Sequence, residues 1–235
     1  MFNGKMKALT FSYDDGVLQD ERLIELFKKY GMKATFNLNS GLLGKVGKLT
    51  HPNFGKTVDH SCFTTDKVKR IYDGFEVAVH THTHPLLPSL SEEDIVFQVE
   101  KDRELLSELV GYDVLGMAYP CGGVNNDDRV AEIIKRRTPI KYSRTITSCY
   151  SFEKQENLLR FNPTIYHMEW DKMFELAEDF LRANPKTPML YYGWGHSYEL
   201  DFVDGYWEKF EDLLKLLAFK DDIFYGTNMQ TLIGK

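Results

Sequence analysis

Short apolar runs alternate with amphipathic stretches along the whole chain. Residues 7–13 are mostly apolar, β-branched or aromatic, and the letters DDG end this run as a strand end would. In residues 17–30 the apolar side chains recur mainly at three- and four-residue spacings, and Gly31 follows where the C-terminal cap of a helix is expected. The chain is therefore predicted to open with a strand, a loop and a helix.

The same unit recurs towards the C-terminus. Ser91 is expected to cap a long helix, because Glu93 and Asp94 in its first turn complement the helix dipole. Residues 142–161 carry no clear pattern, and a long loop follows the second strand. Further strands are predicted at residues 34–38, 76–80, 114–119, 164–166, 189–194 and 223–225, and further helices at residues 65–72, 91–110, 127–137, 172–182, 205–219 and 227–232.

Strands that alternate with helices of this length predict an α/β fold built from right-handed βαβ units. The strands would form a parallel sheet, either open or closed into a barrel, and periodicity alone does not choose between the two. No Pro- or Ser-rich linker, internal repeat or charge block divides the chain. We therefore expect a single domain over residues 1–235.

Composition and charge exclude several classes of protein. The 29 Lys and Arg residues against 35 Asp and Glu residues give a formal charge of −6, which disfavours nucleic acid and anionic membranes as partners. The three cysteines show no CxxC spacing, so neither a disulfide framework nor a thiolate zinc site is indicated. The N-terminal residues reach carboxylates before they could form the apolar core of a signal peptide, and we expect a cytoplasmic protein.

Polar residues of interest follow the apolar runs, at the predicted carboxyl ends of strands, where parallel α/β folds carry their sites. Asp14 and Asp15 follow the first strand. Adjacent carboxylates repel each other, and at a strand end both can face a cation that relieves the repulsion. A turn in which one of the two Asp residues caps the next helix explains this pair equally well.

Three histidines, His80, His82 and His84, follow the third strand. Imidazole and carboxylate ligands suit zinc, cobalt, nickel or iron, and two histidines with one Asp leave positions for water and substrate. An extended segment would place all three on one face, whereas a turn brings together residues four apart. Pro85 favours a turn, so we expect His80 and His84 to be ligands and His82 to point away; a solvated His-rich turn is the plainer alternative.

Two weaker clusters follow later strands. In AYPCGG, around Cys121, a Pro and Gly turn exposes backbone N–H groups that can hold a developing oxyanion, although without further context an ordinary βα loop is the better explanation. In GWGHS, His196 stands at a strand end among glycines. Its imidazole suits a general acid or base, although a lone histidine is more often structural.

In this order the four segments resemble the motifs of the polysaccharide deacetylases of carbohydrate esterase family 4, the NodB-homology fold. TFSYDDG resembles the opening T-F-D-D-G motif with two inserted residues, and HTHTHP resembles H-[ST]-x-x-H. AYPCG resembles R-x-P-Y-G, and GWGHS resembles the closing L-H motif. The first two are specific together and the last two are weak. The resemblance covers most of the chain and implies a deformed (β/α) barrel of about seven parallel strands.

The resemblance also implies a metal-dependent deacetylase that uses one divalent ion, zinc first and cobalt, nickel or iron as the alternatives. Asp14 would be the general base, and His196 the general acid. Cys121 stands where the family usually has Tyr, and its backbone N–H would form the oxyanion hole. The metal ligands would be Asp15, His80 and His84.

This sequence departs from the family pattern in two places. The Arg that pairs with the base is replaced by Ala118, so Asp14 lacks its expected partner; Arg144 or Arg160 are the candidates to replace it. The Asp that normally orients the catalytic His has no clear counterpart, and Asp171, just after a tryptophan, is the nearest resemblance.

The expected substrate is a small N- or O-acetylated sugar or oligosaccharide. Two alternatives stay open: a metal-dependent amidohydrolase acting on a small non-sugar amide, and a non-catalytic carbohydrate-binding homologue. Several aromatic residues in the same predicted loops could stack on a sugar ring or fill the barrel mouth. They are Tyr119, Tyr166, Trp170, Trp194 and Tyr198.

Overall fold

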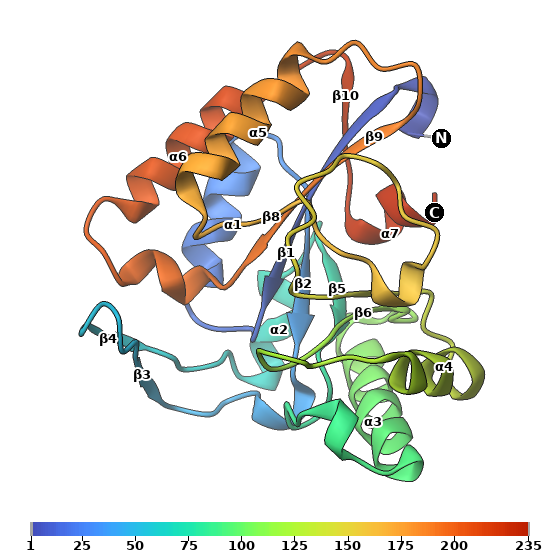
Figure 1. Cartoon of the computed structure of the whole chain (residues 1–235). Helices are drawn as coiled ribbons and strands as arrows, with labels where there is room; N and C mark the ends of the chain where they lie inside the picture. Colours follow the sequence, from blue (N-terminus) through green and yellow to red (C-terminus); the bar gives the residue numbers. More distant parts are fainter. Residues whose placement is uncertain (1, 235) are drawn as a thin grey trace.

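A curled sheet of parallel strands forms the centre of the molecule (Figure 1). The structure is a computed structural model, and it describes residues 2–234. Hydrogen bonds join the strands in the order β7-β6-β5-β2-β1-β9-β8, and β10 pairs with the first residues of β1. The strands of this sheet are β1 (Lys7–Asp14), β2 (Ala34–Leu38), β5 (Glu76–Val79), β6 (Gly116–Ala118), β7 (Tyr142–Arg144), β8 (Ile165–Tyr166), β9 (Met189–Gly195) and β10 (Ile223–Tyr225).

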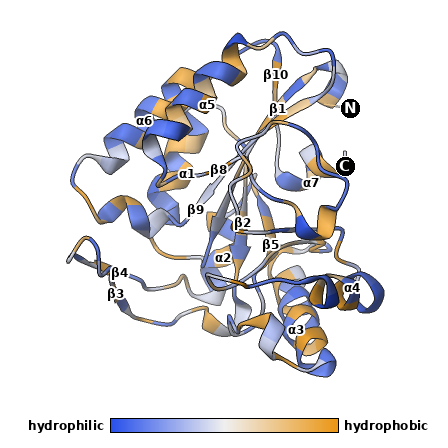
Figure 2. Cartoon of the chain, viewed as in Figure 1, coloured by the Kyte–Doolittle hydropathy of each residue, from blue (hydrophilic) through white to orange (hydrophobic). Residues whose placement is uncertain are grey.

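Seven α-helices accompany the sheet in the described part of the chain. Helices α1, α5 and α6 lie together on one side, and α3 and α4 pack against each other on another (Figure 1). Along α5 and α6 hydrophobic residues alternate with hydrophilic ones (Figure 2), as expected of helices that bury one face. The helices are α1 (Asp20–Lys29), α2 (Thr65–Ile71), α3 (Glu92–Val110), α4 (Asp128–Arg137), α5 (Trp170–Arg182), α6 (Tyr206–Leu217) and α7 (Asn228–Leu232).

The sheet curls into a barrel that strand pairing leaves open between β7 and β8. The chain itself bridges much of this gap, because Phe161 lies beside β7: its N–H donates to Ser143 O (3.0 Å), and Thr145 N–H donates to Phe161 O (2.8 Å). Four residues later Ile165 pairs with β9. The expected single-domain, deformed (β/α) barrel of parallel strands is therefore confirmed.

The alternation of β1 decides which of its side chains reach the interior of the barrel. Leu9, Phe11 and Tyr13 belong to the core that the helices cover. Ala8 belongs instead to a second cluster with interior residues such as Tyr192. Successive side chains of a strand point to opposite faces, so the remaining even-numbered residues share the interior with Ala8: they are Thr10, Ser12 and Asp14. All eight residues of β1 are buried.

Helix α7 closes the end of the barrel at which β5 begins. Its first turn meets Glu76, whose Oε2 accepts Met229 N–H at 2.9 Å and whose Oε1 accepts Tyr142 O–H at 2.7 Å. A carboxylate at a helix N-terminus is stabilised by the unpaired N–H groups and the helix dipole. This end is filled by protein, which leaves the carboxyl ends of the strands as the open mouth.

Three local differences from the sequence prediction have physical causes. Helix α1 begins at Asp20 rather than at residue 17, because Val17 forms a β-bridge with Cys62. Strand β7 was missed within residues 142–161, since its polar Ser143 and Arg144 are buried inside the barrel. The long predicted loop contains a short antiparallel hairpin, the β3–β4 hairpin, whose strands are β3 (Lys48–Thr50) and β4 (Thr57–Asp59).

Five 3₁₀ turns complete the described elements: η1 (Phe2–Gly4), η2 (Ser40–Leu42), η3 (Leu87–Ser89), η4 (Leu158–Arg160) and η5 (Ser197–Asp201). Within residues 2–234, no helix combines the length and the apolar character that crossing a bilayer requires.

Candidate active site

A cavity of about 250 Å³ opens at the carboxyl ends of β1, β5, β6 and β9. The structure brings all six predicted site residues to this one cavity, although they come from four separate parts of the sequence. Its lining residues are Asp14, Asp15, His80, His84, Tyr119, Cys121, Gly122, Ile146, Trp194, His196 and Tyr198.

Asp15, His80 and His84 form a group that fits a divalent cation. Each offers one ligand atom, and these atoms all lie within 4.8 Å of one another. Asp15 Oδ1 is 3.7 Å from Nε2 of His80 and 3.7 Å from Nε2 of His84. A carboxylate and two imidazoles that converge in this way are a donor set suited to zinc and similar metals.

The hydrogen bonds of both histidines favour the tautomer that a ligand needs. His80 Nδ1 lies 2.9 Å from Ala118 O, which can only accept, so Nδ1 carries the proton and Nε2 presents its lone pair. His84 Nε2 accepts the Cys121 N–H at 3.3 Å, so this nitrogen carries no proton. A cation bound to Nε2 would take this lone pair in place of the N–H. Burial, with His80 nearby, lowers the pKa of His84 to about 4, so its ring is neutral at neutral pH.

Asp15 supplies the negative charge of the group. Burial by itself would raise its pKa, but a contact with His60 and the nearby His196, His80 and His84 lower the pKa of Asp15 below its usual value. The backbone of Asp15 has a positive φ of 81°, which turns this side chain out of the strand direction set by Asp14.

His82 points away from the cavity, as expected. Its Nδ1 lies 2.9 Å from Ser40 Oγ, and its ring packs edge-on against Phe97. The side chain is therefore engaged on the outer side of the loop, and among the described residues the group of converging ligand atoms does not include it.

Asp14 is 1% exposed and has two fixed partners. Arg144 Nη2 donates to Asp14 Oδ2, and Asn37 Nδ2 donates to Asp14 Oδ1 at 2.7 Å. Arg144 thus pairs with Asp14 in place of the family's motif Arg, whose position is occupied by Ala118 in this chain. The other candidate, Arg160, was wrong, because its guanidinium bonds to Asn126 and Asp128 outside the cavity.

Arg144 is held from several sides although it is fully buried. Its Nε–H donates to Ser12 Oγ at 3.2 Å, and Nη1 donates to Thr145 O at 3.0 Å. The guanidinium carbon lies 4.3 Å from the ring centroid of Trp194, a cation–π distance. These contacts fix the plane of the Arg144 guanidinium, and thereby the direction from which it binds Asp14.

Glu199, which the sequence prediction missed, is the acidic partner of His196. Its Oε2 lies 3.1 Å from His196 Nδ1 and 2.7 Å from Nε2 of the buried His167. Asp171 was the wrong choice, because its side chain is exposed and its ionic partner is Lys209. A usable signal was present in the spacing His-x-x-Glu, because His196 is the N-cap residue of η5 and Glu199 is the third residue of that turn.

The charge of Glu199 changes the acidity of His196. Burial would lower the pKa of His196, but the Glu199 carboxylate and the nearby Asp15 and Asp14 raise this pKa to about 10. His196 is therefore an imidazolium at neutral pH, with Nε2 3.9 Å from Asp14 Oδ2.

The glycine before His196 has a packing reason. A Cβ at Gly195 would lie 2.3 Å from the ring of His167, so only glycine lets this buried histidine lie against β9. The ring of His167 then reaches both Glu199 Oε2 and Tyr13, whose OH lies 3.1 Å from His167 Nδ1.

The histidine loop also has a buried acidic support that the sequence did not suggest. Asp102 on α3 accepts the N–H of His80 at 3.0 Å and the N–H of Ser40 at 2.6 Å. Burial raises the pKa of Asp102 to about 7 even though these donors lower it. Its role is to hold the backbone from which His80 projects.

Several residues around the cavity hold a backbone conformation that side chains rarely adopt. Besides Asp15, positive φ values occur at Thr81 (69°), His84 (60°) and Cys121 (68°). Such conformations persist only where the surroundings determine them, and they concentrate at functional sites. Here the strained residues lie in the first three of the four segments that the sequence analysis singled out.

Three of the five aromatic candidates line the cavity: Tyr119, Trp194 and Tyr198. Tyr166 instead donates its OH to Glu199 Oε1, and Trp170 packs against Tyr206. The aromatic wall available to a substrate is therefore smaller than the sequence suggested.

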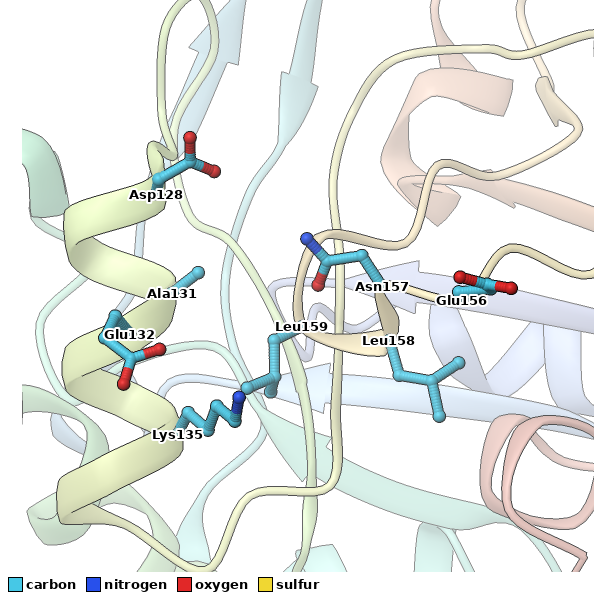
Figure 3. Close-up of a pocket in the computed structure, with 8 residues that line it drawn as sticks. All are labelled: Asp128, Ala131, Glu132, Lys135, Glu156, Asn157, Leu158 and Leu159. Atoms are coloured by element: carbon cyan, nitrogen blue, oxygen red, sulfur yellow. The ribbon is translucent and has the colours of Figure 1, made fainter.

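A larger groove of about 570 Å³ lies between α4 and η4 (Figure 3). Asp128, Glu132 and Lys135 of α4 face Asn157 and the two leucines of η4 across it (Figure 3). No predicted site residue lines this groove, and Asp128 is already paired with Arg160. Although this groove is larger than the cavity at the strand ends, its lining does not carry the predicted chemistry.

The chain belongs to the polysaccharide deacetylase family, because the model of that family matches residues 2–137, more than half of its length. Over 127 residues the chain is 25% identical to peptidoglycan-N-acetylmuramic acid deacetylase PdaC of Bacillus subtilis (strain 168). That alignment covers 54% of this chain and 24% of PdaC, so the chain spans about a quarter of this relative.

Solved structures share the fold. The Streptococcus pyogenes deacetylase PplD in complex with acetate has a TM-score of 0.51 at 22% identity, over 64% of this chain and 61% of PplD. A family 4 carbohydrate esterase from Streptomyces lividans in complex with acetate has a TM-score of 0.56 at 10% identity, over 95% and 92% of the two chains. A CE4 family pseudoenzyme from Bacillus anthracis has a TM-score of 0.55 at 21% identity, over 100% and 68%.

The buried pair of Arg144 and Asp14 predicts a large stability effect. We expect Arg144→Gln to lower the free energy of unfolding by about 3–5 kcal/mol, because it leaves a buried carboxylate without its counter-charge. Urea denaturation followed by circular dichroism measures the change. Arg160→Gln is the matched control, and a surface pair of this kind contributes at most about 1 kcal/mol. Equal effects of the two substitutions would contradict the assignment.

Proposed function

We propose that this protein is a metal-dependent deacetylase that removes an acetyl group from an N- or O-acetylated sugar or oligosaccharide. The observation that carries the proposal is the convergence of Asp15, His80 and His84 on one point, with Asp14 and His196 lining the same cavity. A carboxylate base, an imidazolium acid and a cation site around one small cavity are the parts that hydrolysis of an amide or ester requires.

The ligand set determines what a cation would do here. A bound divalent ion supplies Lewis acidity, which polarises an acyl carbonyl and lowers the pKa of a water. Asp15 would hold it with one carboxylate oxygen, and His80 and His84 with Nε2. Zinc suits these ligands best, with cobalt, nickel or iron as alternatives.

Asp14 takes the proton of the attacking water in this proposal. Arg144 and Asn37 bind its two oxygens and keep the carboxylate in one orientation. A base that is held in this way needs no reorganisation when the proton moves. The negative charge of Asp14 is also balanced by Arg144 in the resting protein.

His196 donates the proton that the leaving group needs. The acyl C–N or C–O bond breaks as Nε2 transfers its proton to the departing nitrogen or oxygen, which releases acetate and a free amine or alcohol. Glu199 keeps His196 protonated before this step. The backbone N–H of Cys121, which donates to His84 Nε2 in the structure, remains our predicted oxyanion donor.

The size of the cavity supports a substrate that enters only in part. About 250 Å³ is below the usual range for sites that enclose a whole drug-sized ligand, so we propose that the acetyl group and part of one ring enter while the rest stays outside. Trp194 and Tyr198 offer apolar faces to that ring. The relative PdaC is named as a deacetylase of a peptidoglycan sugar, and this supports a sugar as the substrate class here.

The similarity to a pseudoenzyme gives the non-catalytic alternative some weight. It is opposed by the completeness of the site, in which Arg144 and Glu199 provide partners for the base and the acid. An amidohydrolase acting on a non-sugar amide would use the same groups, so only substrate tests separate it from the proposed function.

Acetate release is the test of this proposal. We expect the protein to release acetate from acetylated chito-oligosaccharides when zinc or cobalt is added, and to stop when a chelator removes the metal. A panel of small acetylated amines assayed in parallel identifies the substrate class. Faster release from those amines would favour the amidohydrolase, and no release from any compound would favour the non-catalytic homologue.

Substitutions should separate the ligands from the base. Asp15→Ala and His84→Ala are expected to lower zinc occupancy, because each removes a ligand atom. Asp14→Asn should keep zinc and lower turnover by about 10²–10⁴-fold, the usual contribution of a positioned base. Elemental analysis after dialysis and an acetate assay measure the two effects. Equal loss of metal in all three variants would contradict these roles.

The pairing of His196 with Glu199 predicts a change in the pH profile. The pKa of His196 is raised to about 10, so the acid form persists through neutral and mildly alkaline pH and is lost as the pH passes that pKa. Glu199→Gln removes the stabilising charge and lowers the pKa of His196. The alkaline limb of kcat/KM should therefore move to lower pH by about one unit or more. An unmoved limb would show that another group is the acid.

A further inference from the structure

We propose that His60, which directly follows β4, is a positioning residue of the metal site. Its ring holds Asp15 by the carboxylate oxygen Oδ2, which is not the oxygen that faces the two histidine ligands. This inference rests on the metal centre of the proposed function and adds to it a residue that no sequence motif contains. It makes the segment that follows the β3–β4 hairpin part of the site.

The two oxygens of Asp15 have different neighbours. Oδ1 lies 3.7 Å from Nε2 of both His80 and His84, whereas Oδ2 lies 3.4 Å from Nε2 of His60. Within the described residues the group of converging ligand atoms contains Asp15, His80 and His84 but not His60. His60 therefore contacts the carboxylate from the side opposite to the two histidine ligands. This is the place of an outer partner that orients a ligand.

The backbone keeps His60 at this distance. Directly after it, Val17 and Cys62 form an antiparallel bridge, and Leu18 N–H donates to Ser61 O at 2.9 Å. Phe63 N–H donates to Gly16 O at 3.1 Å. The segment that follows β4 is thus joined by hydrogen bonds to the turn that follows Asp15. Movement of one would move the other.

The ring of His60 is also fixed by packing. It meets Tyr198 edge-on, with ring centroids 4.7 Å apart, and Tyr198 in turn lines the cavity. The His60 side chain is about one-third exposed, and Asp15 is 13% exposed. The contact is therefore partly shielded from water, where an imidazole N–H bound to a carboxylate is worth more than on an open surface.

The hairpin offers a matched control for this contact. His51 lies in the same hairpin, but its ring packs against Phe54 and Phe202. A change at His51 disturbs the hairpin without touching Asp15. Comparing the two histidines separates an effect on the Asp15 carboxylate from a general effect on the hairpin.

The test measures zinc affinity directly, by competition with a chromogenic chelator on the full chain. We expect His60→Phe, which keeps an aromatic ring against Tyr198, to weaken zinc binding about 10- to 100-fold, the usual effect of removing an outer partner of a metal ligand. His60→Gln, which retains an N–H donor, should recover most of the affinity. His51→Phe should bind zinc as the wild type does. Thermal unfolding of the metal-free variants checks that each is folded.

Three results would overturn the inference. Zinc affinity of His60→Phe equal to that of the wild type would show that the contact does nothing for the site. Equal weakening by His51→Phe would assign the effect to the hairpin as a whole. A zinc-loaded crystal structure with His60 Nε2 at about 2.0–2.1 Å from the ion would make His60 a ligand instead.

These outcomes differ from a failure of the proposed function. If the wild type binds zinc and His60→Phe binds it weakly, the role of His60 holds even if no acetylated sugar is hydrolysed. If the wild type binds no divalent metal, the metal centre and the role of His60 are both rejected.

Discussion

The buried ion pair between Arg144 and Asp14 is the constraint that organises this molecule. Removing two charges from water costs several kcal/mol per ion unless geometry and further hydrogen bonds compensate. The compensation comes from different strands of the barrel: Asp14 ends β1 and Arg144 ends β7. Ser12 of β1 accepts the Arg144 Nε–H, and the ring of Trp194 on β9 lies 4.3 Å from the guanidinium carbon. The pair can form only if the sheet curls enough to bring these strands face to face. Fold and site therefore depend on each other.

The other charges follow from this pair. Glu199 pairs with His196, and Arg144 pairs with Asp14. The carboxylate of Asp15 instead lies 3.4–3.7 Å from the Nε2 atoms of His60, His80 and His84. The carboxylates of Asp14, Asp15 and Glu199 thus outnumber the cations Arg144 and His196 in and directly behind the cavity wall. The remaining negative charge lies where the ligand atoms converge. Electrostatics and donor chemistry consequently favour a cation at the same point.

The sequence predicted most of the strands and helices because their side chains show clear periodicity. It could not predict β7, whose interior position requires Ser143 and Arg144 where a strand pattern requires apolar residues. The spacing of His80 and His84 was readable because a turn brings residues four apart together. Arg144 could be named only as one of two candidates, and Glu199 was missed although it lies three residues after His196. His60 could not be found, since it reaches the site through tertiary packing from a segment without a recognisable motif.

The family match covers only some of the residues that build the site. It ends at residue 137, after the segments that supply Asp14, Asp15, His80 and His84. Arg144, His196 and Glu199 all come later in the chain. The proposed cation ligands and the base Asp14 therefore lie in the part that the family model matches, and the proposed acid His196 and the partners Arg144 and Glu199 lie beyond it.

The positive φ angles at Asp15, Thr81, His84 and Cys121 have a consequence for how this sequence can change over time. A left-handed backbone costs roughly 1–2 kcal/mol for most residues, and glycine avoids this cost. Selection for chemistry must oppose that gain wherever the side chain is needed. In a descendant released from catalysis, mutation of Asp15 or His84 to glycine would be rewarded by stability, and such replacements would be an early trace of lost activity.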